Sequence, residues 1–315
     1  MGALPPQKTS HQKAIEQENS LKAGDLNPKL IIKIVTKIKA GKAHEISEGD
    51  TIYLGACTKG ATRDSSYRKQ PYSDIPAKQR AFSLKLNYVN LIIKEDIDSE
   101  PIVKTISQYG AGQSFEDYVI QQFNPYLNRS VNYLLKKFAP NIDKKPKNYC
   151  DIIARGILGI KKRKIAEFEK ANISMKTIRI YASGMPKESM SFPAFKYIDL
   201  LEEKHWESSE LFLTFTKRFF FVIFEHREDD LFLKKVMFWT MPVKDLEIAK
   251  SVWIRTRKQI MTGRYGELPK LSDNPISHVR PHGRDKEDTY PTPDGGKFKK
   301  QCFWLNARYI KEQIR

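Results

Sequence analysis

One apolar run constrains the fold of this chain more than any other feature. Between Arg218 and Glu225 the sequence reads RFFFVIFE, with no polar residue alternating among the apolar ones. A strand that faces water on one side alternates polar and apolar residues, whereas a strand covered on both faces does not. The run therefore predicts a buried central strand. The segment from Leu231 to Thr240 predicts a second strand, reached through a turn at 226–230.

Other patterns predict helices and one more strand around this pair. Apolar residues recur at helical spacing in three basic or mixed segments, and alternation predicts a strand in a fourth. The predicted helical segments are Lys29–Lys39, Gln113–Phe138 and Ala249–Met261, and the predicted strand is Ile173–Ile180. Together they indicate a mixed α/β or α+β fold. We expect a disordered tail at 1–24 and a domain boundary near residue 100, between segments 25–100 and 101–315.

The charge of the chain is strongly positive and unevenly distributed. Lysine and arginine number 55 against 37 acidic residues, a formal net charge of +18. Residues 29–90 carry 12 basic and 5 acidic residues, and residues 254–315 carry 14 and 7, so each stretch has a net charge of +7. Two basic patches attract polyanions such as DNA, RNA or an anionic membrane. Since no apolar run approaches the roughly 20 residues of a membrane span, we expect no membrane partner.

The two basic stretches also resemble each other. The segment YLGACTKGA followed by KQRAFSLKLNYV is echoed by ISHVRPHGR followed by KKQCFWLNARYI. In this alignment Phe82 matches Phe303, and Leu84 matches Leu305. We expect these four residues in the core, and the polar residues between them in contact with a ligand. Each half would then hold a basic loop, a hairpin-like insert and a segment anchored by an aromatic residue.

These motifs resemble a known family. GKAHEISEGDTIYLGACTKGA and QPYSDIPAKQRAFSLKLNYV are similar to the recognition lobe of the MutH family. The similarity is greatest to its Sau-type type II restriction endonucleases, which cut at GATC. HVRPHG, DTYPTPDG and KQCFWLNARYI resemble the end of the second, effector domain of those enzymes. The resemblance implies a partial MutH-like lobe at 25–100 and a MutH-like, restriction-endonuclease-like effector domain at 101–315.

The resemblance also implies which residues contact double-stranded DNA containing GATC. These residues lie in two matching groups, one in each half of the chain. They are Thr58, Lys59, Gly60, Arg80, Ser83 and Lys85 in the first half, and Arg280, His282, Trp304 and Asn306 in the second. Lysine and arginine would hold phosphates, while Ser83 or Asn306 could reach base edges.

The catalytic site that the family implies is incomplete in this sequence. In the family, carboxylates hold Mg²⁺ and a lysine orients the attacking water. Only some 25 polar residues precede the matching region, so the catalytic half of the first domain is expected to be missing. In the second domain Glu116, Glu167 and Lys176 match the family's glutamate, aspartate and lysine, but Ser174 replaces the second carboxylate. We expect a degenerate site to which no catalytic residue is assigned, and no Mg²⁺ bound by this chain.

Two other functions remain open at this point. The first is an active Mg²⁺-dependent GATC endonuclease that uses Glu116, Glu167 and Lys176, and the second is a non-specific RNA binder. A separate catalytic half or a second copy of the chain are the expected protein partners. The three widely spaced cysteines form no CxxC motif and indicate a reducing compartment, so we expect a cytoplasmic protein.

Overall fold

The computed structural model describes residues 28–50, 54–59, 66–85, 89, 99–100, 114–141, 146–162 and 164–315. The chain divides into two compact units. Unit 1 comprises Met1–Gln113 with Lys162–Ile173, and unit 2 comprises Ser114–Lys161 with Ser174–Arg315. Unit 1 therefore includes a segment that is distant in sequence, which no sequence pattern indicated. The tail predicted at 1–24 lies outside the described residues.

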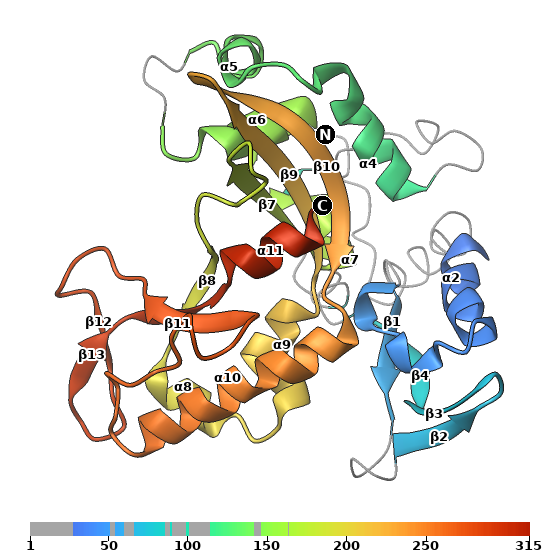
Figure 1. Ribbon diagram of the computed structural model, residues 1–315, viewed down its shortest axis with the longest axis vertical. Coiled ribbons are helices and arrows are strands. Elements are labelled where there is room, and N and C mark those ends of the chain that lie inside the picture. The colour runs from blue at the N-terminus through green and yellow to red at the C-terminus, as the bar shows by residue number, and fades with distance from the viewer. Residues whose placement is uncertain are drawn as a thin grey trace, which may run out of the picture. The chain divides into compact units, whose positions relative to one another are not determined.

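Unit 1 is built from small elements around a short helix. Its elements are α2 (Pro28–Lys39), the 3-10 helices η2 (Ala43–Glu45) and η3 (Glu48–Asp50), β1 (Leu54–Thr58), β2 (Tyr67–Gln70), β3 (Ser73–Lys78), β4 (Arg80–Leu84), the parallel pair β5 (Ser99–Glu100) and β6 (Lys164–Ile165), and α7 (Ala166–Ala171) (Figure 1). The helix predicted at 29–39 is confirmed as α2. Ile34 of this helix packs with Ile46 and Ala56 in a small core.

Unit 2 contains the longer elements and the main core. Its first part holds α4 (Phe115–Phe123), η6 (Asn124–Tyr126), α5 (Val131–Phe138), α6 (Tyr149–Ile157), β7 (Ile173–Ile180, shared at its first residue with unit 1), β8 (Met190–Phe195), α8 (Tyr197–Glu202), η7 (Trp206–Ser208) and α9 (Glu210–Phe215). Its second part holds β9 (Arg218–Arg227), β10 (Asp230–Thr240), α10 (Val243–Met261), β11 (Ser277–Pro281), β12 (Thr289–Pro291), β13 (Lys297–Lys299), β14 (Gln301–Leu305) and α11 (Ala307–Gln313). The mixed α/β class predicted from the sequence is confirmed.

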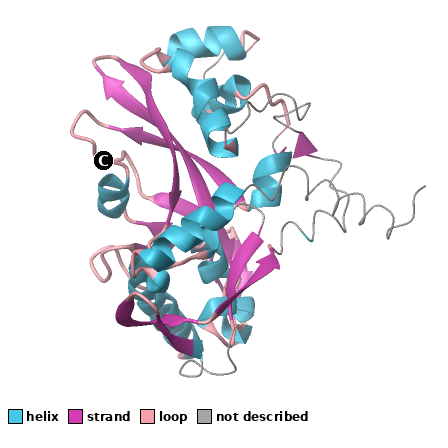
Figure 2. Cartoon of the chain, turned by 90° about the vertical axis from the view of Figure 1, so that its right-hand side faces the viewer, coloured by secondary structure: helices cyan, strands magenta, loops and turns pink. Residues whose placement is uncertain are grey.

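The apolar run forms the central strand of a sheet with the order β10-β9-β7. Both faces of β9 are covered, as the absence of alternation predicted. On one face Phe220 contacts Phe123 of α4, with ring centroids 5.4 Å apart. On the other face Phe221 stacks on Trp239 at 5.3 Å, and Trp239 in turn contacts Tyr309 of α11. In both views helices lie near each of the two ends of the long β9–β10 hairpin (Figures 1 and 2).

A second sheet in unit 2 has the order β11-β14-β8, with antiparallel pairing throughout. Helices α8, α9 and α10 contribute Leu200, Leu211 and Val252 to the core that this sheet shares with β9. Over the described part of the chain, none of the helices combines the length and apolarity needed to cross a bilayer.

Two sequence-based predictions of local structure need correction. The family resemblance matches AEFEKANISMKTI, which holds Glu167, Ser174 and Lys176, to the strand pair of the metal site, but its first half is helix α7, followed by β7. Glu167 and Glu169 lie in the first turn of α7, where acidic side chains favour a helix, and Asn172 ends it in the left-handed conformation with φ of 55°. The single helical region at 113–138 is divided into α4 and α5, because Pro125 enters the 3-10 turn η6 between them.

Candidate nucleic-acid interface

The internal echo in the sequence corresponds to a repeated strand pair. In unit 1, β1 pairs with β4, and the hairpin β2–β3 is inserted between them. In unit 2, β11 pairs with β14, and the hairpin β12–β13 is inserted at the same place. The amide of Lys59 donates to the carbonyl of Gln79 at 2.8 Å, and the amide of His282 donates to that of Lys300 at 2.9 Å. Lys59 and His282 therefore occupy equivalent positions, directly after the first strand of each pair.

The predicted contacts of unit 1 fall into an exposed and a buried group. Thr58 and Lys59 are exposed at the end of β1. Arg80 is half-buried and donates from Nη1 to the carbonyl of Ala56 at 2.5 Å, and Ser83 is half-buried on β4. Lys85 is only 7% exposed, and its ammonium donates to the carbonyl of Ala171 at 3.2 Å. Gly60 lies outside the described residues.

The predicted contacts of unit 2 gather around one indole ring. Arg280 is exposed, and its guanidinium lies over the ring of Trp304, 5.4 Å from the ring centroid. His282 is also exposed and meets Trp304 edge-on, with centroids 5.5 Å apart. Arg280 and His282 are two residues apart along an extended segment, so both reach the same side of the strand pair. A cation, an imidazole and a half-buried indole thus form one small surface.

Asn306 has an internal role in the structure. It is 4% exposed, and its Nδ2 donates to the carbonyl of Asn274 at 2.7 Å. That bond orients Oδ1 toward Nδ1 of His278, 2.6 Å away, so Nδ1 of the imidazole carries the proton and donates. Burial lowers the pKa of His278, and the charge of Arg280 lowers it further, so the ring is neutral at physiological pH. Asn306 and its counterpart Lys85 both connect the strand pair to the interior.

An open cavity in unit 2 brings two predicted sites together. It has a volume of about 400 Å³, and its walls include His282 and Trp304 together with Lys176. Sequence reasoning treated the first two as DNA contacts and the third as part of a degenerate catalytic site. Lys176 is on β7, donates to the carbonyl of Ser191 at 3.2 Å and lies over the ring of Phe192. Burial lowers the pKa of Lys176, and the charge of Lys217 lowers it further.

The other residues of the predicted catalytic set have different local surroundings. Glu116 forms an ion pair with Arg218 at 2.6 Å. Glu167 is buried on α7 and belongs to unit 1, whereas Lys176 belongs to unit 2. Ser174 is half-buried on β7 and supplies no charge.

Mg²⁺, which the restriction-endonuclease fold implies, does not fit the described residues that line this cavity of unit 2. This ion is held by oxygen ligands, chiefly carboxylates. The acidic residues that line the cavity are Asp151 and Glu188, and they form ion pairs with Arg155 and Arg179. Among the described residues, no group of three or more His, Cys, Asp or Glu side chains could hold a metal ion.

Sequence reasoning missed two features of these surfaces. The first is Arg218. A charged residue at the start of an apolar run needs a partner of opposite charge inside the protein, and Glu116 is that partner. The second is the exposed basic residues on the inserted hairpins, Arg68 and Lys69 on β2 and Lys297 and Lys299 on β13. Their clustering in the sequence was a usable signal, because it falls inside each insert.

The mixed α/β architecture is consistent with a restriction-endonuclease-like fold, and comparison with known proteins agrees. No protein-family model matches the chain. The chain is 37% identical over 335 aligned residues to the type II restriction enzyme Sau3AI of Staphylococcus aureus, covering 88% of this chain and 67% of that protein. This chain is thus a member of the restriction endonuclease class. Within that class it belongs to the family of Sau3AI-like type II restriction enzymes.

Proposed function

We propose that the chain binds duplex DNA sequence-specifically, at GATC, as the recognition and effector part of a Sau-type restriction enzyme. The observation that carries the proposal is the repeated strand pair, with Lys59 exposed in one copy and Arg280 and His282 exposed at the matching end of the other. Both copies lie in the stretches where the positive charge of the chain is concentrated. As part of the same proposal, we assign both units to the MutH family.

In this proposal each strand pair supplies both phosphate contacts and base contacts. Lys59 and Arg280 neutralise backbone phosphates, together with the basic residues of the inserted hairpins. Thr58, Ser83 and His282 contact the groove, where hydroxyl and imidazole groups read base edges. Trp304 holds Arg280 in place through its ring face. Lys85 and Asn306 are left out of the interface, because their side chains are bonded inside the protein.

The binding proposal is tested with fluorescently labelled duplexes at several salt concentrations. Lys59→Ala and Arg280→Ala should each weaken binding and reduce the salt slope by about one unit per lost phosphate contact. Lys204→Ala and Arg308→Ala, at exposed positions elsewhere, serve as controls. Unchanged affinity and slope in both test variants would reject the site. Equal affinity for GATC duplex, scrambled duplex and RNA at moderate salt would favour the non-specific RNA binder.

We also propose that the chain does not cut DNA by itself, and that it acts with a separate catalytic half or as a homodimer. The ion pair between Glu116 and Arg218 supports this view, because it leaves that carboxylate neutralised by protein rather than metal. The alternative is a Mg²⁺-dependent endonuclease that cuts at GATC through unit 2. Linearisation of GATC-containing plasmid by the wild type with Mg²⁺, but not by Lys176→Ala, would establish the alternative.

A further inference from the structure

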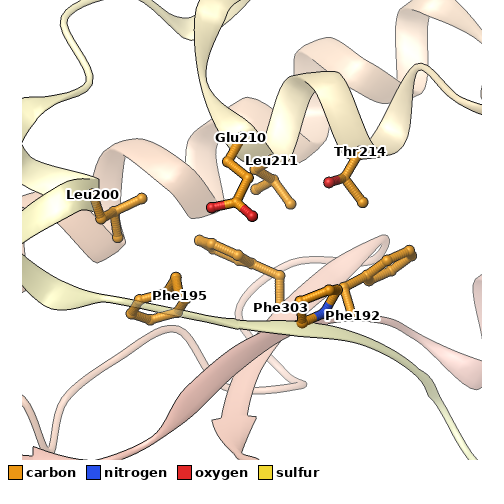
Figure 3. Close-up of a pocket in the computed structure, with 8 residues that line it drawn as sticks. Phe192, Phe195, Leu200, Glu210, Leu211, Thr214 and Phe303 are labelled. Atoms are coloured by element: carbon orange, nitrogen blue, oxygen red, sulfur yellow. The ribbon is translucent and has the colours of Figure 1, made fainter. Parts of the chain in front are cut away.

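The two strand pairs differ in how they place their apolar side chains. In unit 2, Phe303 and Leu305 of β14 are buried, and Figure 3 shows Phe303 beside Phe195 of β8. In unit 1, Phe82 and Leu84 hold the matching positions of β4, yet they are 55% and 41% exposed. The prediction that all four belong to the core is thus right for unit 2 and wrong for unit 1.

The hairpins inserted into the two strand pairs show a similar contrast. In unit 2, Tyr290 and Phe298 pair across β12 and β13 and pack against the main core. The turn between these strands is the segment 292–296, TPDGG, which has no large apolar residue. In unit 1, Tyr72 lies in the turn between β2 and β3 and is 61% exposed, and Ile75 on β3 is 53% exposed. The hairpin of unit 1 thus ends in an apolar tip, defined by Tyr72 and Ile75.

This apolar tip is held against the turn that follows α2. The side chain of Gln70, the last residue of β2, accepts from the amide of Ala43 at 3.0 Å and donates to the carbonyl of Ile75. Gly41 comes so close that a Cβ at this position would lie 2.6 Å from the carbonyl oxygen of Tyr72. The backbone of the tip is therefore fixed by its neighbours while its two large side chains point into solvent.

Positive charge surrounds the apolar tip. Arg68 and Lys69 on β2 are exposed, and Lys78 at the end of β3 is half-buried. Against these three basic residues the hairpin has one acidic residue, Asp74. The hairpin ends beside Lys59, whose amide donates to the carbonyl of the residue that directly follows Lys78. The tip therefore extends from the same end of the strand pair that the proposed function places on DNA.

Apolar side chains among cations are a known means of deforming duplex DNA. Isolated apolar residues on a surface need no explanation, but two large ones on a fixed hairpin tip do. In proteins that bend DNA, basic residues hold the phosphates while an apolar wedge enters the minor groove, partly unstacks one base step and kinks the duplex. The sequence at that step then affects binding, because some steps unstack more easily than others.

We propose that the apolar tip of hairpin β2–β3 is a wedge that enters the minor groove and bends the bound duplex at a base step flanking the four-base site. Tyr72 and Ile75 separate the two base pairs of that step, and Lys69 holds the adjoining phosphates. The proposal rests on the proposed DNA binding by the strand pairs. It adds a second kind of recognition, in which the deformability of the flanking sequence contributes to affinity.

Bending is measured by energy transfer between dyes at the two ends of a duplex of about 30 base pairs with GATC at its centre. We expect the wild type to bend this duplex by at least about 20° and Tyr72→Ser and Ile75→Ser each to reduce the bend by about half or more. Each substitution should weaken binding by about tenfold on the intact duplex, but by less than about threefold when a mismatch has already unstacked the flanking step. The salt slope should not change, because no phosphate contact is lost.

The matched control is Ile254→Ser, at a 50% exposed apolar position of α10, which should bend DNA as the wild type does. A straight duplex bound with full preference for GATC would overturn the wedge and leave the proposed function intact, as would equal bending by the wild type and both tip variants. Absence of any duplex binding by the wild type would reject the proposed function and the wedge together. Near-UV circular dichroism checks the folding of each variant, and either tip variant suffices for the test if the other unfolds.

Discussion

The carboxylate of Glu116 lies 2.6 Å from the guanidinium of Arg218, joining the first turn of α4 to the first residue of the central strand β9. Arg218 is buried at the start of β9, directly before the apolar run 219–224, so its charge needs this partner. The family resemblance assigns Glu116 to metal binding, whereas the structure gives it a role in holding α4 against the sheet.

Removing one partner of this ion pair should destabilise the protein. Arg218→Met leaves Glu116 with an uncompensated, partly buried charge, and we expect a loss of about 2–3 kcal/mol in the free energy of unfolding. Urea unfolding followed by circular dichroism measures it. Adding Glu116→Gln to Arg218→Met should restore part of the loss, and equal stability of Arg218→Met and wild type would refute the structural role.

Equivalent phenylalanines of the two repeats should differ in their contribution to stability. Phe303→Ala removes a buried ring and should cost about 3–5 kcal/mol, whereas Phe82→Ala, at an exposed position, should cost less than about 1 kcal/mol. Chemical unfolding of the two variants in parallel tests the contrast. Similar losses would show that Phe82 is covered in solution.

Acid should destabilise unit 2 partly through His278. The folded-state pKa of this residue lies below its ordinary value of 6.5, chiefly because the ring is buried. The unfolded state therefore takes up a proton more readily, and the stabilising contribution is present above pH 6.5 and is lost as pH falls through the folded pKa. Urea midpoints at pH 8, 6.5 and 5 should fall less steeply for His278→Gln than for wild type. Parallel curves would contradict the assignment.

Lys176 should titrate below its ordinary pKa of 10.5, because burial disfavours the ammonium and Lys217 repels it. Reductive ¹³C-methylation of lysines followed by NMR titration measures this, with Lys176→Arg assigning the signal. Removing the repulsion by Lys217→Met should raise the pKa of Lys176 while leaving it below 10.5, since the effect of burial remains. A signal that titrates at 10.5 in the wild type would show an accessible amine.

Much of the fold could be predicted from local patterns. The strands at 173–180 and 231–240 and the helices at 29–39 and 249–261 follow from periodicity, and the structure confirms them. The repeat was visible as Phe82 and Phe303 at matching positions, and the structure adds that its two segments pair as β1–β4 and β11–β14. The sequence did not predict helix α7. Acidic residues in the first turn of a helix and carboxylates of a metal site cannot be told apart from the sequence alone.

The sequence by itself determined that β9 is a central strand, that the charge lies in two stretches, and that the two stretches share one motif. These properties depend on residues close together in the chain, where periodicity and composition act directly. Only the tertiary structure decided that Glu116 pairs with Arg218, that Asn306 faces His278, and that Phe303 is buried while Phe82 is exposed. Each of these depends on which distant segments lie beside a side chain, and the same residue type at equivalent positions of the repeat is therefore buried in one copy and exposed in the other.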